Sequence, residues 1–203
     1  MISQIPFDFA RPGATLANFV PGRNTELLAR LEALDFPAVL YLWGEAGSGK
    51  THLIEATRET HGPRVVVADN AQSLNAAEQE ALFDAFNRTL QGGAKLVVAG
   101  DAPPLRLQHL REDLRTRLGA GLVFEVQPLS DDEKRLAIRA AAHERGLALG
   151  DEFVAYLLTH FPRDLRRLIA LLDALDRYSL AAKRPVTLPL LRELLRDDQL
   201  AAR

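Results

Sequence analysis

The sequence contains no cysteine, one methionine and one tryptophan. Without cysteine the chain can form neither disulfides nor thiolate-based zinc and iron–sulfur sites, and it has no cysteine nucleophile. A chain of 203 residues, of which 47% are apolar, is large enough to bury a core without such crosslinks. The composition therefore predicts a globular protein that folds through packing alone.

Long apolar runs and an excess of one charge are also missing. The longest apolar stretch, residues 36–43, is far shorter than the roughly 18 residues that span a membrane, and residues 1–4 show no signal-peptide pattern. We therefore expect a cytoplasmic protein without a membrane partner. The formal net charge is −2 and no part of the chain is strongly basic, so we expect any contact with DNA to run through a partner protein.

Short apolar runs alternate with helical patterns up to Leu129. The pattern predicts four strands, at residues 38–43, 65–68, 95–99 and 122–126. It predicts helices at residues 25–34, 50–60 and 76–90, the last opened by a capping box at Asn75 and Glu78. Strands that alternate with helices indicate an α/β fold, in which a parallel sheet has helices on both faces and a ligand site at the carboxyl ends of its strands.

Beyond Pro128 the apolar spacing becomes helical throughout. A second capping box, Ser130 and Glu133, begins a helix that ends at Gly146, and further helices are predicted at residues 151–160, 164–181 and 187–195. Residues 1–24 combine prolines and glycines with no periodicity and predict an extended arm. We therefore expect an N-terminal arm (1–24), an α/β domain (25–129) and a small all-helical subdomain (130–203).

One motif carries phosphate chemistry. The segment Gly44-Glu45-Ala46-Gly47-Ser48-Gly49-Lys50-Thr51 follows the first predicted strand and opens a helix, which is the context of a phosphate-binding loop (P-loop). Its glycines turn backbone N–H groups toward a phosphate, Lys50 reaches the β- and γ-phosphates, and the Thr51 hydroxyl is a ligand for Mg²⁺. We expect nucleotide binding by Gly44, Gly47, Ser48, Gly49, Lys50 and Thr51.

A P-loop protein also needs an acidic residue at the end of a neighbouring strand, and Asp69 follows the predicted strand 65–68. At that place Asp69 would hold Mg²⁺ together with Thr51. The next residue is Asn70, where many such ATPases have a glutamate that activates the attacking water. Because an amide cannot accept that proton, we expect a nucleotide-binding protein with slow hydrolysis of its own.

With these features in place, the chain resembles the DnaA-related AAA+ family of bacterial replication proteins, and within it the regulatory inactivators of DnaA. The resemblance rests on the P-loop and on four further segments, namely 40–43 (Leu-Tyr-Leu-Trp), 69–70 (Asp-Asn), 100–104 (Gly-Asp-Ala-Pro-Pro) and 127–131 (Gln-Pro-Leu-Ser-Asp). It implies an AAA+ sheet domain followed by a helical lid subdomain. It also implies a bound adenine nucleotide with Mg²⁺, ADP in preference to ATP.

The same resemblance assigns roles to individual residues. Phe19 and Val20 would lie on the adenine side of the nucleotide, and Asp101 would be the first nucleotide sensor. Arg163 would be the second sensor, contributed by the lid. Arg117 would be an arginine finger that completes the ATPase site of a neighbouring DnaA molecule in trans. The implied function is negative regulation of DNA replication initiation, by conversion of ATP-DnaA to ADP-DnaA.

The first residues resemble the peptide by which this family docks on the sliding clamp, the β subunit of the replicative DNA polymerase. In Gln4-Ile5-Pro6-Phe7-Asp8-Phe9, the side chains of Gln4, Ile5, Phe7 and Phe9 would enter pockets of the clamp from an extended segment. The implied partners are therefore DnaA and the clamp, with DNA reached only through the clamp.

The chain departs from the family pattern in two places. Asp69 follows the P-loop helix so closely that one strand and one helix of the family are missing, which predicts a sheet of four strands. No DNA-binding domain is expected after the lid, because the sequence ends at Arg203. The residues leave two other functions open: an autonomous P-loop ATPase or kinase, and a non-catalytic scaffold associated with the clamp or with helicase loading. They also leave the oligomeric state open, a homo-oligomer included.

Overall fold

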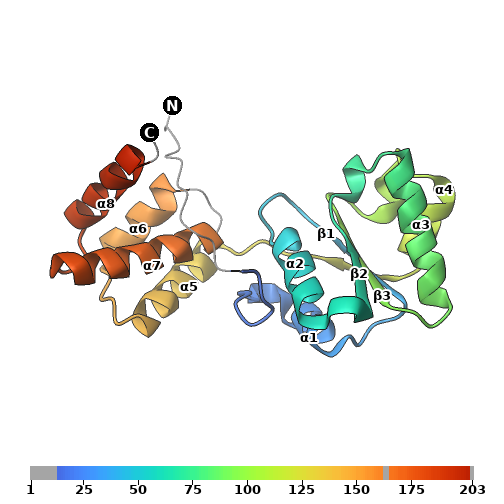
Figure 1. The fold of residues 1–203 in the computed structure, drawn as a ribbon, viewed down its shortest axis with the longest axis horizontal. Coiled ribbons are helices and arrows are strands. Elements are labelled where there is room, and N and C mark those ends of the chain that lie inside the picture. The colour runs from blue at the N-terminus through green and yellow to red at the C-terminus, as the bar shows by residue number, and fades with distance from the viewer. Residues whose placement is uncertain (1–12, 162–164, 202–203) are drawn as a thin grey trace. The chain divides into compact units, whose positions relative to one another are not determined.

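The computed structural model describes residues 13–161 and 165–201, with side chains described as far as residue 196. The chain divides into two compact units between Leu129 and Ser130. The first, here named the α/β unit, is Gly13–Leu129, and the second, the helical unit, begins at Ser130 (Figure 1).

The α/β unit is built on a parallel sheet. Its four strands are β1 (Val39–Trp43), β2 (Val65–Ala68), β3 (Lys95–Gly100) and β4 (Leu122–Glu125). They lie in the order β2-β3-β1-β4, and all three neighbouring pairs are parallel. Trp43 pairs with Gly100 of β3 and Glu125 of β4, so the carboxyl ends of these strands meet at one edge. The predicted α/β fold and the predicted four-stranded sheet are confirmed.

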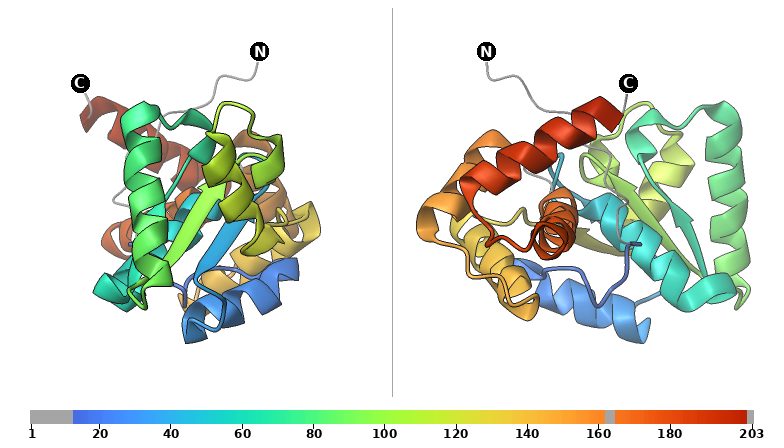
Figure 2. Two further views of the ribbon diagram at one scale, coloured as in Figure 1. Left: turned by 90° about the vertical axis from the view of Figure 1, so that its right-hand side faces the viewer. Right: turned by 60° about the vertical axis from the view of Figure 1, so that its left-hand side comes forward.

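Four helices cover the two faces of this sheet (Figures 1 and 2). Leu40 and Leu42 of β1 join one apolar cluster with α1 (Thr25–Ala33) and α2 (Lys50–His61). Val39 and Tyr41, which point the opposite way, join a second cluster with α3 (Ala76–Leu90) and α4 (Glu112–Gly119). Both clusters are buried because β1 alternates its side chains between two helix-covered faces, which is why its sequence is apolar at every position.

Helix α3 begins where its capping box predicts. The Glu78 N–H donates to Asn75 Oδ1 at 3.0 Å, and the Asn75 N–H donates to Glu78 Oε2 at 2.8 Å. Each contact satisfies a backbone donor that the first helical turn leaves without an intrahelical partner.

Helix α4 was not expected from the sequence. Only Leu114 and Leu118 of this helix are buried, both with 0% of the side chain exposed. Two apolar residues four positions apart are too few to reveal a helical period among charged neighbours. The helix forms because those two leucines pack under the sheet beside α3.

Residues 13–24, expected as part of an N-terminal arm, pack into the α/β unit. Leu16 and Phe19 are buried in the cluster beneath α1 and α2. Asn24, 4% exposed, donates from Nδ2 to Gln127 O at 2.9 Å and accepts from the Gln127 N–H at 2.8 Å. Through these bonds the segment before α1 is fixed to the chain that leaves β4.

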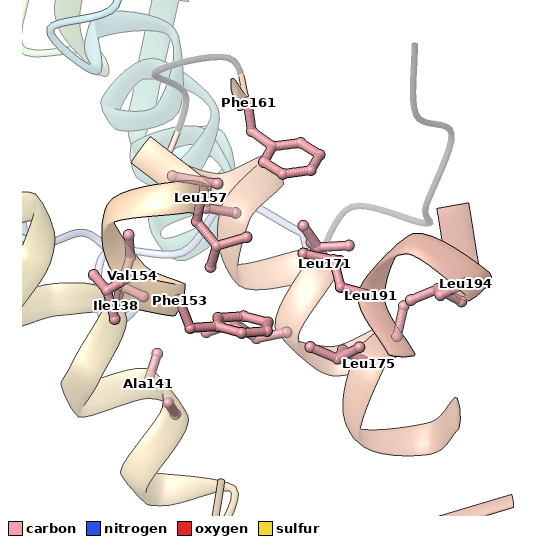
Figure 3. Packing of buried hydrophobic residues seen from close by; sticks show 14 of the residues in the cluster. Ile138, Ala141, Phe153, Val154, Leu157, Phe161, Leu171, Leu175, Leu191 and Leu194 are labelled. Atoms are coloured by element: carbon pink, nitrogen blue, oxygen red, sulfur yellow. The ribbon is translucent and has the colours of Figure 1, made fainter. Parts of the chain in front are cut away.

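Within its described residues, 130–161 and 165–201, the helical unit contains four helices, which are α5 (Asp131–Glu144), α6 (Asp151–His160), α7 (Leu165–Ala182) and α8 (Leu188–Ala201). The capping box of α5 is formed, since the Glu133 N–H donates to Ser130 Oγ at 3.2 Å and the Ser130 N–H donates to Glu133 Oε2 at 2.7 Å. Apolar side chains from all four helices meet in one core, as Figure 3 shows for Ile138, Phe153, Leu157, Leu175 and Leu191. Across residues 13–161 and 165–201, no helix combines the length and apolarity needed to cross a membrane.

Candidate functional site

The P-loop leaves β1 and enters α2 at the carboxyl edge of the sheet. Gly49 has φ +102°, a left-handed conformation that residues with a Cβ rarely adopt. A Cβ at this position would also lie 2.8 Å from Phe19 Cε2. Gly47 has φ +83°. The loop therefore needs glycine at both positions to keep its backbone in this turn.

Lys50 folds back over the loop. Its Nζ donates to the carbonyl oxygens of Gly44 at 2.7 Å and Glu45 at 2.8 Å. Burial lowers the pKa of the Lys50 ammonium, while the charges of Asp69 and Asp101 raise it. Lys50, Asp69 and Asp101 come from the P-loop and from the ends of two strands, yet they lie close enough for their charges to interact. A phosphate oxygen would replace the carbonyl acceptors of Lys50.

Thr51 and Asp69 are in direct contact. Thr51 Oγ1 donates to Asp69 Oδ2 at 2.7 Å, and Asp69 Oδ1 accepts the Asn70 N–H at 2.7 Å. Within the residues described, no group of three or more His, Asp and Glu side chains forms a metal site. A hydroxyl and one carboxylate match a Mg²⁺ ion, which takes its other ligands from phosphates and water.

Ser48 supplies a test of whether a phosphate fits this loop. Its Oγ is buried and has no hydrogen-bond partner among the described residues. Buried polar groups are normally paired, and an unpaired one points to a missing ligand or water. Together with the glycine turn, Lys50 and Thr51, this orphan hydroxyl fits a site that a phosphate completes.

The backbone that follows Asp101 is bonded by a residue from the neighbouring strand. Tyr41 of β1 donates its hydroxyl to Ala102 O at 3.0 Å. The Tyr41 hydroxyl lies so close to Gly100 that a Cβ on Gly100 would collide with it. Burial, with the negative charge of Asp101, raises the pKa of the Tyr41 phenol. The sequence analysis gave Tyr41 no contact with the chain beside Asp101, because it counts as one more apolar position of a buried strand.

Phe19 lies beside the P-loop but inside the core. Its ring is 9% exposed, contacts Gly49 and stands edge-on to His52 at 5.4 Å between centroids. Val20 is half-buried next to it. The residues predicted for the second sensor (Arg163) and for the clamp peptide (Gln4, Ile5, Phe7 and Phe9) lie outside the described residues.

Arg117 lies on α4, and its guanidinium contacts side chains of α3. Its Nη1 donates to Asn87 Oδ1 at 2.6 Å. The guanidinium carbon stands 4.4 Å from the centroid of the Phe83 ring and 5.2 Å from that of Phe86. A guanidinium stacked on an aromatic face and fixed by one hydrogen bond keeps other N–H donors for a ligand. The sequence analysis did not predict these contacts of Arg117, although Phe83, Phe86 and Asn87 share one face of a predicted helix.

Two family models match the chain once this geometry is established. The model described as "Bacterial DnaA ATPAse domain" matches residues 58–125, and the model described as "Hda, lid domain" matches residues 131–195. The two matches support a Hda/DnaA-related AAA+ protein. The first match begins after the P-loop, so the phosphate site rests on the motif and geometry described above. The second match falls within the helical unit.

Solved structures share the fold of this chain. Domain III of DnaA from Thermotoga maritima has 23% identity and a TM-score of 0.68, with 95% of this chain and 98% of that chain covered. AMPPCP-bound DnaA from Aquifex aeolicus has 23% identity and a TM-score of 0.63, with 82% and 66% covered. RuvB from T. maritima has 20% identity and a TM-score of 0.60, with 93% and 73% covered. The predicted AAA+ sheet domain followed by a helical lid is confirmed.

Proposed function

We propose that this AAA+ protein regulates replication initiation by stimulating ATP hydrolysis on DnaA, as the inactivator Hda does, so that ATP-DnaA becomes ADP-DnaA. The matches to the DnaA ATPase domain and the Hda lid support a DnaA-related replication regulator. The observation that carries the proposal is how the Arg117 side chain is placed. Its guanidinium is half-buried and supported by α3, and it joins none of the hydrogen bonds recorded for the P-loop.

The chemistry needs little more than a positioned cation. Water attacks the γ-phosphorus of ATP on DnaA, the bond from that phosphorus to the bridging oxygen breaks, and ADP takes the electron pair while the water proton passes to solvent. Arg117 would contact the γ-phosphate oxygens and stabilise their charge as the bond breaks. An arginine supplied in trans is commonly worth about 10³ to 10⁵ in rate.

The protein's own nucleotide site serves a structural role in this proposal. Lys50 and the P-loop N–H groups would hold the phosphates, and Thr51 with Asp69 would hold Mg²⁺. An adenine nucleotide at this site is supported by the AMPPCP bound to the A. aeolicus DnaA structure. The preference for ADP over ATP rests on the family resemblance alone. Asn70 supplies no base at the hydrolytic position, so the bound nucleotide would turn over slowly.

The clamp is the second partner in this proposal. Residues 4–9 carry the Gln, apolar, aromatic pattern of a clamp peptide, which would tether the protein to clamps loaded on DNA. A solved DnaA structure contains single-stranded DNA. For this chain the net charge of −2 favours contact with DNA through the clamp.

The deciding experiment measures phosphate release from ATP-loaded DnaA with and without this protein, in the presence of clamp loaded on DNA. Wild type should stimulate release, whereas Arg117→Ala and a deletion of residues 4–9 should not. Arg115→Ala is the matched control, because this arginine of α4 makes no side-chain hydrogen bond or ion pair recorded in the described part of the chain.

Other outcomes identify the alternatives. ATP turnover by this protein alone, abolished by Lys50→Ala and indifferent to Arg117→Ala, would identify an autonomous ATPase. Binding to the clamp without any stimulation of DnaA would identify a scaffold. Either result would refute the proposed function.

A further inference from the structure

One face of α3 faces α4 with four side chains, Gln79, Phe83, Phe86 and Asn87, here named the α3 stripe. Phe83 lies four positions after Gln79, and Phe86 and Asn87 lie three and four positions after Phe83, so the four share one face of the helix. Phe83, Phe86 and Asn87 support Arg117, as described above. The same stripe also holds a second arginine, Arg111.

The backbone of Arg111 is anchored by a buried side chain. The Arg111 N–H donates to Gln79 Oε1 at 2.9 Å, and Gln79 is 7% exposed. The amide nitrogen of Gln79 donates to Leu74 O at 3.0 Å and to His109 O at 3.3 Å. All the polar atoms of the Gln79 side chain are thereby used, and the start of α4 is tied to the start of α3. The position from which the Arg111 side chain extends is fixed.

The Arg111 guanidinium shares the Phe83 ring with Arg117. Its carbon lies 5.2 Å from the ring centroid, where that of Arg117 lies at 4.4 Å. Both arginines line an open surface depression together with Glu112, Asp113 and Thr116. Two guanidinium groups on one ring repel each other, and a nearby anion offsets that repulsion by attracting both.

Asp113 supplies that anion in the free protein. Its Oδ2 accepts from Arg111 Nη2 at 2.8 Å. Burial raises the pKa of the Asp113 carboxyl. Hydrogen bonds from the Leu114 N–H and from Arg111, together with the charge of Arg117, outweigh this effect and hold that pKa below its usual value. The carboxylate is ionised at neutral pH, and it stands where a phosphate would be attracted.

We infer that Arg111 is a second phosphate-contacting arginine of the site in trans. The depression receives the triphosphate of a nucleotide bound to the neighbouring DnaA subunit, with Arg117 on the γ-phosphate and Arg111 on an adjacent phosphate. The inference rests on the proposed function. A guanidinium binds a phosphate through two parallel N–H donors, which the Asp113 carboxylate now occupies in part. On docking, the phosphate takes the place of Asp113 beside Arg111.

The test is single-turnover hydrolysis of ATP preloaded on DnaA, measured against increasing concentrations of this protein with clamp on DNA. The fit separates the maximal rate from the half-saturating concentration. Arg111→Ala should lower the maximal rate on the order of 10²-fold, the effect of removing one donor that stabilises transition-state charge. Arg111→Lys should restore part of it, because lysine keeps the charge and loses the paired donors.

Two further variants make the test specific. Asp113→Asn keeps the oxygen that accepts the Leu114 N–H and removes the competing charge, so the maximal rate should rise. Arg115→Ala on the same helix should leave the rate unchanged. Arg111→Ala keeps the N–H that binds Gln79, so the anchor of α4 is preserved, and an unchanged far-ultraviolet circular dichroism spectrum checks the fold.

The outcomes distinguish this inference from the proposed function. If Arg117→Ala abolishes stimulation while Arg111→Ala behaves like Arg115→Ala, the second arginine is refuted and the proposed function stands. An Arg111→Ala protein with a raised half-saturating concentration and an unchanged maximal rate would place Arg111 in docking and refute its role on the phosphate. If wild type does not stimulate hydrolysis, or if Arg117→Ala stimulates it as wild type does, the proposed function itself fails.

Discussion

Asn24 ties the first described segment to the end of the sheet, and its replacement by alanine should destabilise the α/β unit measurably. The side chain donates to Pro21 O at 3.1 Å and Gln127 O at 2.9 Å, and it accepts from the Gln127 N–H at 2.8 Å. Alanine leaves both backbone groups of Gln127 without these partners. Each unsatisfied group costs about 1–3 kcal/mol, and both are only partly buried, so we expect a loss of about 2–3 kcal/mol.

The assay is urea denaturation followed by tryptophan fluorescence. The protein has one tryptophan, Trp43 at the end of β1, so the signal reports the α/β unit. The midpoint should fall while the slope of the free energy against urea stays the same, because the surface exposed on unfolding is unchanged.

The matched control for this prediction is Asn18→Ala in the same segment. Asn18 also makes side-chain hydrogen bonds, to Thr15 and Gly13, but these are exposed to solvent. It should cost at most about 1 kcal/mol. Equal losses for Asn24→Ala and Asn18→Ala would refute the reasoning, because they would show that the bonds to Gln127 contribute nothing beyond an exposed turn.

Three further predictions concern the nucleotide and the helical unit. Lys50→Ala should abolish ADP binding in isothermal titration calorimetry, because it removes the ammonium that would bind the phosphates. Retained binding would contradict the P-loop assignment. Asn70→Glu should raise intrinsic ATP turnover by up to about 10² to 10⁴-fold, the range for a positioned base. It should also lower stability, because position 70 has φ +55°. A turnover rate equal to that of wild type would show that position 70 does not face the attacking water. The hydrogen bond and charge of Arg184 lower the pKa of Glu193, so the ion pair stabilises the helical unit until the pH falls through that lowered pKa. Glu193→Gln should remove this part of the acid dependence of unfolding measured by circular dichroism. Identical acid titrations of wild type and Glu193→Gln would refute the prediction.

Much of the fold follows from local patterns in the sequence. The P-loop motif is contiguous in the sequence, so residues 44–51 could be identified directly. The two capping boxes each join residues three positions apart, and the structure forms both. The strands are short apolar runs because helices cover both faces of the sheet. The roles assigned to the site residues by resemblance remain predictions.

The tertiary structure decided the contacts between distant segments. Arg117 meets Asn87 across 30 positions, Tyr41 meets Ala102 across 61, and Gln127 meets Asn24 across 103. The positions of helix α4, Arg111 and Arg117 depend on packing against α3, which no window of neighbouring residues reveals. Local sequence determines which segments become strands, turns and capped helices, because those preferences arise between near neighbours. The surroundings of a side chain depend on which elements the completed sheet brings together, and that is known only once the chain has folded.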